Sequence, residues 1–346
     1  MPELPEVQTV VSELNRKLKN LTIKSVQVLR PKMVGVGPKT LSPLRTHSPA
    51  AAREFESKLK GEKIKSVSRR AKLLVFDFYR RTYPSSGLRP PSPGKNLSGP
   101  QTDHLSLSGE KNKVGSVWVE GGIKMLVHLK MTGQFIYLKD SELDKKIRLI
   151  NSSTAPLYKL PSPYTHIIFV FSDGSKLFYN DVRQFGYLKL VHDKEIEKVP
   201  ELAEYGPEPL SLEFSLLRFF TAVKKRSKTR IKQLLCDQKI IAGIGNIYSD
   251  EILFRAKIRP DRKVSRIKNQ ELRAIFKAIP FILKKGIAEH GSSVGDFVRT
   301  DGSWGSMGKY HFVYGRGGLP CKVCGTIIKS MKFTGRTGSY CPKCQR

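Results

Sequence analysis

The chain has 346 residues and a mass of 39.0 kDa, and 39% of its residues are hydrophobic, so it is long enough for roughly two to three domains with real cores. It has no uninterrupted run of about 18 apolar residues and no secretory signal at its start, so we expect a cytoplasmic protein rather than a membrane or secreted one. With 62 Lys and Arg against 30 Asp and Glu, the formal charge of +32 favours nucleic acid as the partner over a membrane or ribosome surface.

The first expected element is a helix over residues 3–19. Its apolar residues recur at helical spacing, with charged residues between them, at Val7, Val10, Val11, Leu14 and Leu18. From about residue 21 to residue 190 the chain changes to short segments rich in β-branched and aromatic residues. These segments are 21–29, 63–68, 72–79, 124–129, 134–138, 166–171 and 176–180, with a hairpin turn at Asp173–Gly174 before the last. They predict a sandwich or barrel of two antiparallel sheets.

Two segments interrupt the strand pattern. Residues 81–117 contain five Pro, five Gly and seven Ser and show no periodicity, so they predict a long, exposed and mobile insertion. Residues 140–163 predict a second, shorter excursion. We expect neither segment to carry the chemistry.

The pattern becomes helical after residue 199. Four amphipathic segments, over 211–225, 229–239, 244–256 and 269–291, predict four helices, and a glycine-rich turn over 241–246 joins the second to the third. A loop with five glycines follows over residues 291–310. We therefore expect an α+β chain of three domains: a β-sandwich with an N-terminal helix over 1–195, a helical domain over 196–310 and a small C-terminal domain over 311–346.

Four of the five cysteines lie in that C-terminal domain. They form two Cys-x2-Cys pairs, Cys321 with Cys324 and Cys341 with Cys344, sixteen residues apart. This spacing is typical of a zinc ribbon, in which two knuckles and a β-hairpin hold one structural zinc ion by four thiolates. Two disulfides are the less favoured alternative in an intracellular chain. The fifth thiol, Cys236, lies in an apolar stretch and is expected to be a small buried side chain.

The first residues carry candidate chemistry. Removal of Met1 would leave Pro2 with a free secondary amine. An α-amino group has a pKa of about 7.7–8.0, so part of it is neutral and can attack an electrophilic sugar carbon to form an iminium. Glu3 is placed to move protons beside this amine, and Glu6, one turn on, to hold the terminus. The alternative is that Pro2 and Pro5 merely start the helix and the two Glu complement its dipole.

Seven motifs occur along the chain in a fixed order. They are MPELPEV at the start, Arg-Arg-Ala-Lys72-Leu-Leu, His128-Leu-Lys-Met131-Thr-Gly, Asp181-Val-Arg183-Gln-Phe185-Gly, Ala242-Gly-Ile-Gly-Asn246-Ile-Tyr, Tyr314-Gly-Arg and the cysteine ribbon. Together they closely resemble the formamidopyrimidine-DNA glycosylases, a family of bacterial base-excision repair enzymes. The resemblance covers nearly the whole chain except 81–117 and 140–163. It implies that the helical domain is a helix-two-turns-helix DNA-binding domain.

The resemblance also implies catalytic roles for four residues. Pro2 matches the nucleophile that attacks C1′ of the damaged nucleoside, and Glu3 matches the acid beside it. Lys72 matches a strand lysine that contacts phosphate at the lesion and donates a proton in β-elimination. Arg336 matches the arginine of the zinc hairpin that grips phosphates around the flipped nucleotide and serves δ-elimination.

Further matches concern DNA binding. Met131, Arg183 and Phe185 match the set that fills the void left by the flipped base, where apolar bulk stacks on bases and the guanidinium bonds the orphaned partner base. Asn246 matches a phosphate ligand of the helical motif, and Lys232, with the basic run 224–230 just before it, is a candidate phosphate contact. Tyr164 stands where the family often has a DNA-contacting histidine, with His166 two residues on.

The loop around Thr300–Gly308 matches the lid that covers the extruded base, and its glycines suit a mobile lid. It could equally be a passive connector between the helical domain and the ribbon.

The resemblance implies a bifunctional glycosylase and abasic-site lyase that removes oxidised purines, 8-oxoguanine and formamidopyrimidines, from double-stranded DNA by β- and δ-elimination. We expect it to act as a monomer with one zinc ion. An endonuclease VIII-type enzyme for oxidised pyrimidines is the nearest alternative, although the LPE triplet and the Met/Arg/Phe set favour the purine enzyme. A catalytically silent DNA-binding protein is a third interpretation, and retained Met1 would favour it.

Overall fold

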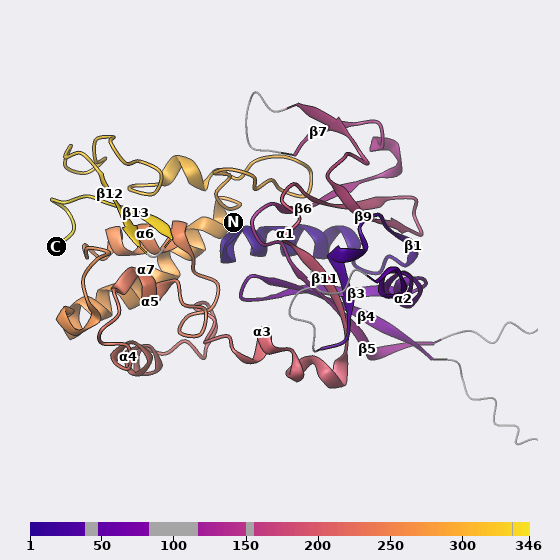
Figure 1. The fold of residues 1–346 in the computed structure, drawn as a ribbon, viewed down its shortest axis with the longest axis horizontal. Helices are drawn as coiled ribbons and strands as arrows, with labels where there is room; N and C mark the ends of the chain where they lie inside the picture. Colours follow the sequence, from indigo (N-terminus) through magenta and orange to yellow (C-terminus); the bar gives the residue numbers. More distant parts are fainter. Residues whose placement is uncertain (39–47, 83–116, 150–155, 334) are drawn as a thin grey trace, which may run out of the picture.

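A computed structural model describes residues 1–38, 48–82, 117–149, 156–333 and 335–346. It has two lobes, one rich in strands and one rich in helices, and the N-terminus lies at the junction between them (Figure 1). The expected insertion lies outside the described residues over 83–116. Its expected ends, 81–82 and 117, are instead parts of the strands β4 (Leu73–Thr82) and β5 (Val117–His128).

The strand-rich lobe is a sandwich of two sheets. One sheet has four strands in the order β1 (Ile23–Val28), β9 (Thr165–Phe171), β10 (Lys176–Asp181) and β6 (Gly133–Leu138). The other has five, in the order β2 (Val34–Val36), β11 (Tyr187–His192), β5, β4 and β3 (Lys63–Arg70). The expected Asp173–Gly174 turn joins β9 to β10, and Gly174 adopts φ +85° there.

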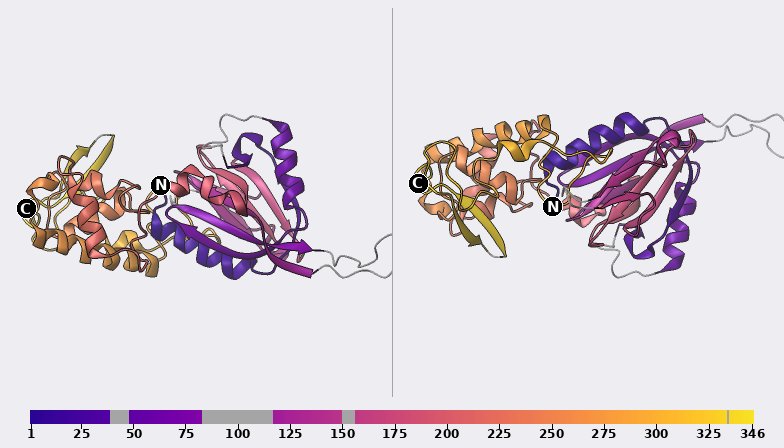
Figure 2. Two further views of the ribbon diagram at one scale, coloured as in Figure 1. Left: turned by 90° about the horizontal axis from the view of Figure 1, so that it is seen from below. Right: turned by 90° about the horizontal axis from the view of Figure 1, so that it is seen from above.

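One core fills the space between these sheets. Alternate residues of the strands face inward, among them Phe76, Phe135 and Phe169, and all three are buried. The helices α1 (Leu4–Leu18) and α2 (Pro49–Leu59) close the core on opposite sides of the sandwich (Figure 2). The two sheets are therefore fixed against each other by apolar side chains of the strand segments that were predicted from their β-branched and aromatic residues.

Two features of this lobe differ from the sequence-based expectation. The region 21–190 contains the helix α2, because Ser48 caps its start and Pro49 occupies its first turn. The pairing of β2 with β11 is parallel, whereas the expected sandwich was antiparallel throughout.

The segment 140–163 is a third difference from the sequence-based expectation. It contains a short hairpin, β7 (Lys146–Arg148) with β8 (Leu157–Lys159). Ile147 and Leu149 are buried in a small separate core with Ile136, Phe178 and Val298. The described residues of this segment thus pack onto the sheet rather than forming a loose excursion.

The helical lobe follows a linker made of a short helix, α3 (Pro200–Ala203). Its four main helices are α4 (Leu216–Lys224), α5 (Ile231–Leu235), α6 (Asn246–Arg255) and α7 (Asn269–Ala288). Their apolar faces share one core, into which Leu4 of α1 also inserts. The two lobes therefore meet at the start of α1. The chain ends in the hairpin β12 (Lys329–Phe333) with β13 (Arg336–Tyr340).

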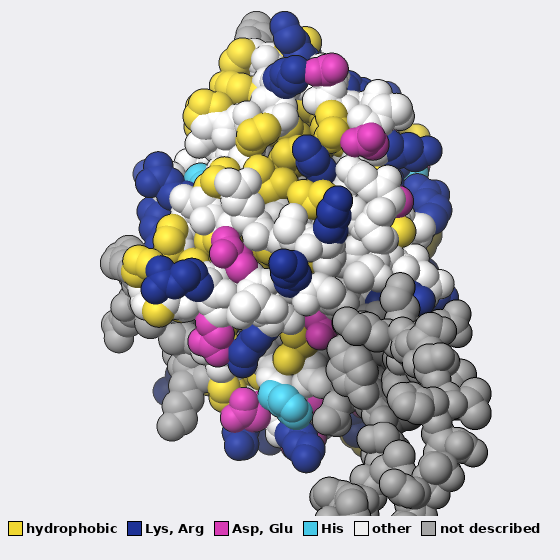
Figure 3. Space-filling view, turned by 90° about the vertical axis from the view of Figure 1, so that its right-hand side faces the viewer, with side chains coloured by type: hydrophobic (Ala, Val, Ile, Leu, Met, Phe, Trp, Pro, Cys, Tyr) yellow, Lys and Arg dark blue, Asp and Glu magenta, His cyan; other side chains and the backbone are white. Residues whose placement is uncertain are grey.

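The outer end of the strand-rich lobe shows Lys and Arg spread among Asp and Glu (Figure 3). The excess of positive charge is therefore not gathered in one patch on that face. None of the described helices is both long and apolar enough to cross a membrane.

Candidate active site and DNA interface

The candidate nucleophile, Pro2, is buried at the junction of the lobes, whereas Met1 before it is 42% exposed. The backbone N–H of Leu4 donates to the carbonyl of Gly243 at 3.0 Å, so the chain start is fixed on the glycine-rich turn of the helical lobe. Gly243 has φ +90°, and a Cβ there would lie 2.8 Å from the Leu4 side chain. This glycine therefore allows the close approach of the two backbones.

Glu3 lies against the N-terminal end of α6. Its Oε2 accepts from the backbone N–H of Gly245 at 2.7 Å, and its Oε1 accepts from that of Ile247 at 2.8 Å. Helix N-termini bind carboxylates because their first N–H groups are unpaired and the helix dipole is positive there. The helical lobe therefore positions the carboxylate that directly follows Pro2.

Glu6 holds the same region from inside. Its Oε2 accepts from the backbone N–H of Glu3 at 2.8 Å, and its Oε1 accepts from the Tyr248 hydroxyl and the Ser292 N–H, both at 2.7 Å. Burial, with the nearby Glu3 charge, raises the pKa of Glu6. Glu6 thus joins the chain start, α6 and the loop after α7, as expected of a residue that holds the terminus.

Lys72 reaches the same point from the start of β4. Its side chain is only 4% exposed, and burial lowers its pKa while the Glu3 carboxylate opposes that shift. A Cβ on Gly245 would lie 2.5 Å from the Glu3 carboxyl carbon and 2.8 Å from Lys72 Nζ. The two groups therefore converge on the space beside Gly245 that a side chain would occupy in any other residue.

Cys236 is buried, as expected, but it also lies near this centre. Its thiol donates weak hydrogen bonds to the carbonyl of Gly245 at 3.3 Å and to the Ser249 hydroxyl at 3.4 Å. Its position beside the Gly245 turn was not visible in the sequence, because nothing in an apolar helical pattern indicates what the far side of the helix faces.

The prediction that Lys232 contacts a phosphate is wrong. The residue is 1% exposed, and its ammonium group lies 2.5 Å from Asp250 Oδ1 and 3.1 Å from the Ser249 hydroxyl. Burial raises the pKa of Asp250 to about 6, and the Lys232 charge opposes that shift. Lys232 is thus an interior ion-pair partner, and it is not available to a phosphate.

Asp250 and Asn246 join α6 to the hairpin. Asp250 Oδ2 accepts from the backbone N–H of Ser339 at 2.9 Å, and Asn246 Nδ2 donates to the carbonyl of Thr337 at 2.9 Å. Arg336, the neighbour of Thr337, is exposed. Asn246 therefore positions the hairpin end that carries the candidate phosphate ligand.

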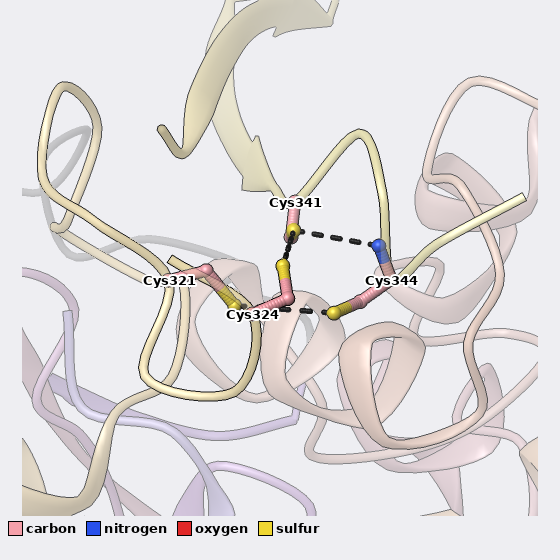
Figure 4. Close-up of side chains that lie close together, drawn as sticks. All are labelled: Cys321, Cys324, Cys341 and Cys344. Carbon is pink, nitrogen blue, oxygen red and sulfur yellow. Dashed lines mark hydrogen bonds between the residues drawn. The ribbon is translucent and has the colours of Figure 1, made fainter. Parts of the chain in front are cut away.

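The four ribbon cysteines lie with their sulfur atoms within 4.8 Å of one another and point toward a common centre (Figure 4). The Cys321–Cys344 and Cys324–Cys341 sulfur separations are 4.0 and 3.5 Å. A tetrahedron with Zn–S bonds of about 2.3 Å has edges of about 3.8 Å, whereas a disulfide needs about 2.05 Å. The donor set fits a closed structural zinc site and not two disulfides.

The candidate void-filling residues lie on two tight turns. Met131 is 40% exposed and Phe185 46% exposed, and the Arg183 guanidinium stacks over the Phe185 ring at 4.7 Å. Asp181 ties the turns together, because it accepts from the Thr132 hydroxyl on one turn and from the Gly186 N–H, at 2.7 Å, on the other. Asp181 opens one of the seven motifs, but its role in joining the two turns depends on their position in the folded chain and could not be seen in the motif.

Tyr164 is half-buried and its ring packs edge-on against Tyr158 of β8 at 5.5 Å. His166 is buried, and its Nε2 lies 2.8 Å from the carbonyl of Asp181. Burial lowers the pKa of His166. His166 therefore supports the residue that ties the two turns, rather than offering a free ring to a ligand.

The segment expected as a lid, 300–308, is fastened at its start. Glu13 of α1 accepts from the Thr300 N–H at 3.0 Å and from Arg299 Nε at 2.6 Å. Lys17 donates to the Thr300 hydroxyl at 2.8 Å. The first residues of this segment are thus fixed to the same helix that carries Pro2 and Glu3 at its start.

Comparison with known proteins identifies three family models. Residues 1–188 match the formamidopyrimidine-DNA glycosylase N-terminal domain, 205–298 match the formamidopyrimidine-DNA glycosylase H2TH domain, and 318–346 match the zinc finger found in FPG and IleRS. Formamidopyrimidine-DNA glycosylases from Heliobacterium modesticaldum and Listeria monocytogenes are 34% and 33% identical over 346 residues, with 100% of both chains covered.

Solved structures are similar over the same length. A Lactococcus lactis FPG variant in complex with a Fapy-dG containing DNA has a TM-score of 0.72 at 27% identity, with 100% of both chains covered. The MutM (FPG) protein of Thermus thermophilus has a TM-score of 0.70 at 29% identity, with 99% of this chain and 98% of that chain covered.

Proposed function

The chain belongs to the formamidopyrimidine-DNA glycosylase family, and from that premise we propose that it removes oxidised purines from duplex DNA through a Pro2 iminium and then cleaves the strand. The family places it among DNA glycosylases with a zinc finger. The observation that carries the finer proposal is the convergence of Glu3 and Lys72 on Gly245, directly beside Pro2. We also propose domain boundaries near residues 195 and 310 and a monomeric enzyme of the bacterial cytoplasm.

The first step needs a free Pro2 nitrogen. The exposed Met1 is open to removal, after which the Pro2 nitrogen forms a bond to C1′ while the glycosidic bond breaks and its electron pair leaves with the base. Glu3 holds or transfers protons at the sugar, since α6 fixes its carboxylate by backbone N–H groups. The nitrogen then gives up its proton to the departing base, and the C1′–O4′ bond breaks as the nitrogen lone pair forms the C1′ iminium. The electron pair of that bond goes to O4′, which takes a proton from Glu3, and the Glu3 carboxylate stabilises the cationic iminium.

Two eliminations follow. In β-elimination a proton leaves C2′ and the 3′-phosphate leaves C3′, and Lys72 supplies a proton at this end because burial lowers its pKa. In δ-elimination a proton leaves C4′ and the 5′-phosphate leaves C5′, and Arg336 on the exposed hairpin end binds that phosphate. The zinc ion, held by the four cysteines, has a structural role only and takes part in no bond making.

Met131, Arg183 and Phe185 are proposed to fill the space left by the flipped nucleotide. Their support is the pair of exposed turns that Asp181 holds together. Asn246 holds the hairpin through the carbonyl of Thr337, and we propose that it also binds backbone phosphate. Tyr164 remains a proposed DNA contact through the part of its ring that Tyr158 leaves open.

Oxidised pyrimidines are the second candidate substrate class. A wild-type Lactococcus lactis FPG (MutM), 27% identical to this chain, was solved with a DNA containing an oxidized pyrimidine. An assay on 8-oxoguanine and thymine glycol duplexes separates the two classes by their relative rates.

Borohydride trapping tests the proposal directly. Borohydride reduces an iminium to a stable amine, so a duplex with one 8-oxoguanine opposite cytosine should become cross-linked to the protein. We expect the cross-link to map to Pro2 and to be lost or sharply reduced in Pro2→Gly. Mass spectrometry of the N-terminus is the control, since a protein that retains Met1 has no free Pro2 amine. No adduct on either lesion class, from protein with a free Pro2, would leave only DNA binding.

A further inference from the structure

A groove of about 420 Å³ lies outside the proposed active site, between the β7–β8 hairpin and the loop 301–304. Its main lining side chains are Lys145, Lys146, Arg148, Leu157, Asp301 and Trp304. The hairpin belongs to the segment 140–163, which carries none of the seven motifs. The proposed active site uses none of these lining residues.

The floor of the groove is fixed rather than loose. Gly302 has φ +81°, and a Cβ there would lie 2.5 Å from Ile147 Cγ2, so only a glycine lets the loop pack on the hairpin. Gln134 donates from one amide nitrogen to the carbonyls of Leu149 on the hairpin side and Asp296 on the loop side. The two walls are thus held at a set spacing.

The groove carries an excess of positive charge. Lys145 and Lys146 are exposed, and Arg148 Nε is shielded from solvent and finds no hydrogen-bond partner within the described part of the chain. The one carboxylate, Asp301, is already engaged, because its Oδ1 accepts from the Ser303 N–H at 2.9 Å and from the Ser303 hydroxyl at 2.6 Å. Lys145 already has a partner, because its ammonium group lies 3.9 Å from Glu142 Oε1. An anion is the ligand that would satisfy Arg148 and Lys146.

An aromatic surface stands beside these cations. Trp304 is 45% exposed at the edge of the groove. A flat ring next to two or three cations is the combination that binds unpaired nucleotides, since the base stacks on the ring and the phosphate meets the cations. A base pair inside a duplex does not offer its face in this way.

We propose that this groove binds an unpaired nucleotide of a DNA strand, with its base on Trp304 and its phosphate at Lys146 and Arg148. The site is distinct from the reacting centre. Glu13, which fastens the loop at Thr300, lies about 14 Å along α1 from Leu4 by helical rise, so the groove does not hold the nucleotide under attack. The inference goes beyond base excision and does not depend on it.

Trp304 itself reports on the test. The chain has two tryptophans, so Trp118→Phe leaves Trp304 as the single indole. Titration of this protein with a single-stranded dT12 oligonucleotide should quench the Trp304 fluorescence to saturation. Arg148→Gln and Lys146→Gln should each weaken binding by roughly tenfold and lower the salt dependence by about one ion. Lys58→Gln on α2, a lysine paired with Glu54, is the matched charge control and should change neither quantity.

Binding measured by filter or anisotropy gives the second readout. Trp304→Ala should weaken dT12 binding by roughly tenfold and Trp304→Phe should restore most of it, because Phe keeps a ring for stacking. A duplex without overhangs and the mononucleotide dTMP test whether the groove requires an unpaired nucleotide within a strand. Quenching of Trp304 by either one, equal to that by dT12, would overturn the proposal. Equal dT12 affinity in Arg148→Gln and Lys58→Gln would overturn it as well.

The test stands apart from the proposed function. Borohydride trapping of Arg148→Gln on the 8-oxoguanine duplex should match that of the native protein, since Arg148 belongs to neither the catalytic nor the void-filling set. Loss of trapping in the native protein with normal dT12 quenching would refute the proposed excision chemistry and leave the groove in place.

Discussion

The Glu3 carboxylate accepts a hydrogen bond from the backbone N–H of Gly245 at 2.7 Å, across the junction of the two lobes. One lobe supplies the candidate nucleophile and acid, and the other supplies the helix end that orients the acid. The reacting centre therefore exists only when the lobes are docked. Gly245 is the residue of the helical lobe that both Glu3 and Lys72 approach closely.

Gly245→Ala should inactivate the enzyme. A methyl group there would lie 2.5 Å from the Glu3 carboxyl carbon and 2.8 Å from Lys72 Nζ, so both groups must move. A displacement of about 1 Å in a catalytic group costs roughly 100-fold in rate, which single-turnover cleavage of an 8-oxoguanine duplex would measure. Gly317→Ala is the control, because its methyl group meets only the rotatable Ser330 hydroxyl. Equal rates for the native enzyme and Gly245→Ala would refute the arrangement.

Lys232→Met should lower the free energy of unfolding and leave the number of phosphate contacts to DNA unchanged. It leaves the buried Asp250 carboxylate unpaired, which costs about 3–5 kcal/mol in the free energy of unfolding. Arg336→Ala, on the exposed hairpin end, should leave the unfolding free energy nearly unchanged and reduce the salt slope of DNA binding by about one. Urea unfolding and salt-dependent binding, measured on both variants, distinguish the structural role of Lys232 from the phosphate-binding role of Arg336. A reduced salt slope in folded Lys232→Met would contradict the structural role of Lys232.

Removal of zinc should abolish DNA binding before it unfolds the chain. The hairpin depends on the four thiolates for its base, whereas the sandwich has its own core. Chelation should therefore remove the contribution of Arg336 and its neighbours, roughly 1–3 kcal/mol of binding for each lost contact, while far-ultraviolet circular dichroism changes little. Cys236→Ala should keep one zinc ion per chain. Zinc-free protein that binds and cuts damaged duplex normally would show that the ribbon is dispensable.

Mild acid should destabilise the protein through His311. This buried ring lies 3.2 Å from the Ser292 hydroxyl, and burial, with the nearby Lys322 charge, lowers its pKa to about 4. The unfolded chain takes up a proton near pH 6.5 and the folded chain only near pH 4, so stability is lost as pH falls through this window.

The contribution of His311 between pH 7.5 and pH 5 is about 2 kcal/mol. We expect His311→Gln to lose that much less stability than the native protein over this range, as measured by urea unfolding at the two pH values. His192→Gln, at an exposed helix start, should behave like the native protein. Identical pH dependence in the native protein and His311→Gln would remove His311 as the cause.

Asp181→Asn should loosen the two void-filling turns. The new amide group would face the Gly186 N–H, so one donor meets another and a buried hydrogen bond worth about 1–3 kcal/mol is lost. Affinity for a duplex with an abasic site should fall by roughly tenfold, measured by fluorescence anisotropy. Asp173→Asn, which alters a similar turn at the β9–β10 hairpin, is the control and should bind as the native protein does.

Much of the fold could be predicted because it depends on local pattern. The helix spacing from Val7 to Leu18, the β-branched and aromatic residues of the strands and the Asp173–Gly174 turn all operate within a few residues. The helix α2 was missed because it is a single short helix in a strand-rich region, and its Ser48 and Pro49 signals are brief. The parallel β2–β11 pair could not be predicted, because strand direction depends on where the chain returns in space.

The site divides in the same way. The sequence by itself determined the residue types with intrinsic chemistry: an N-terminal proline, an adjacent carboxylate and four thiolates at ribbon spacing. Only the tertiary structure decided which charged groups are buried and paired within the protein, because burial and pairing depend on elements far apart in the chain. Lys232 is therefore held by Asp250, Glu3 is held by α6, and Asp181 ties two turns, although in the sequence each is only a charge beside an apolar run.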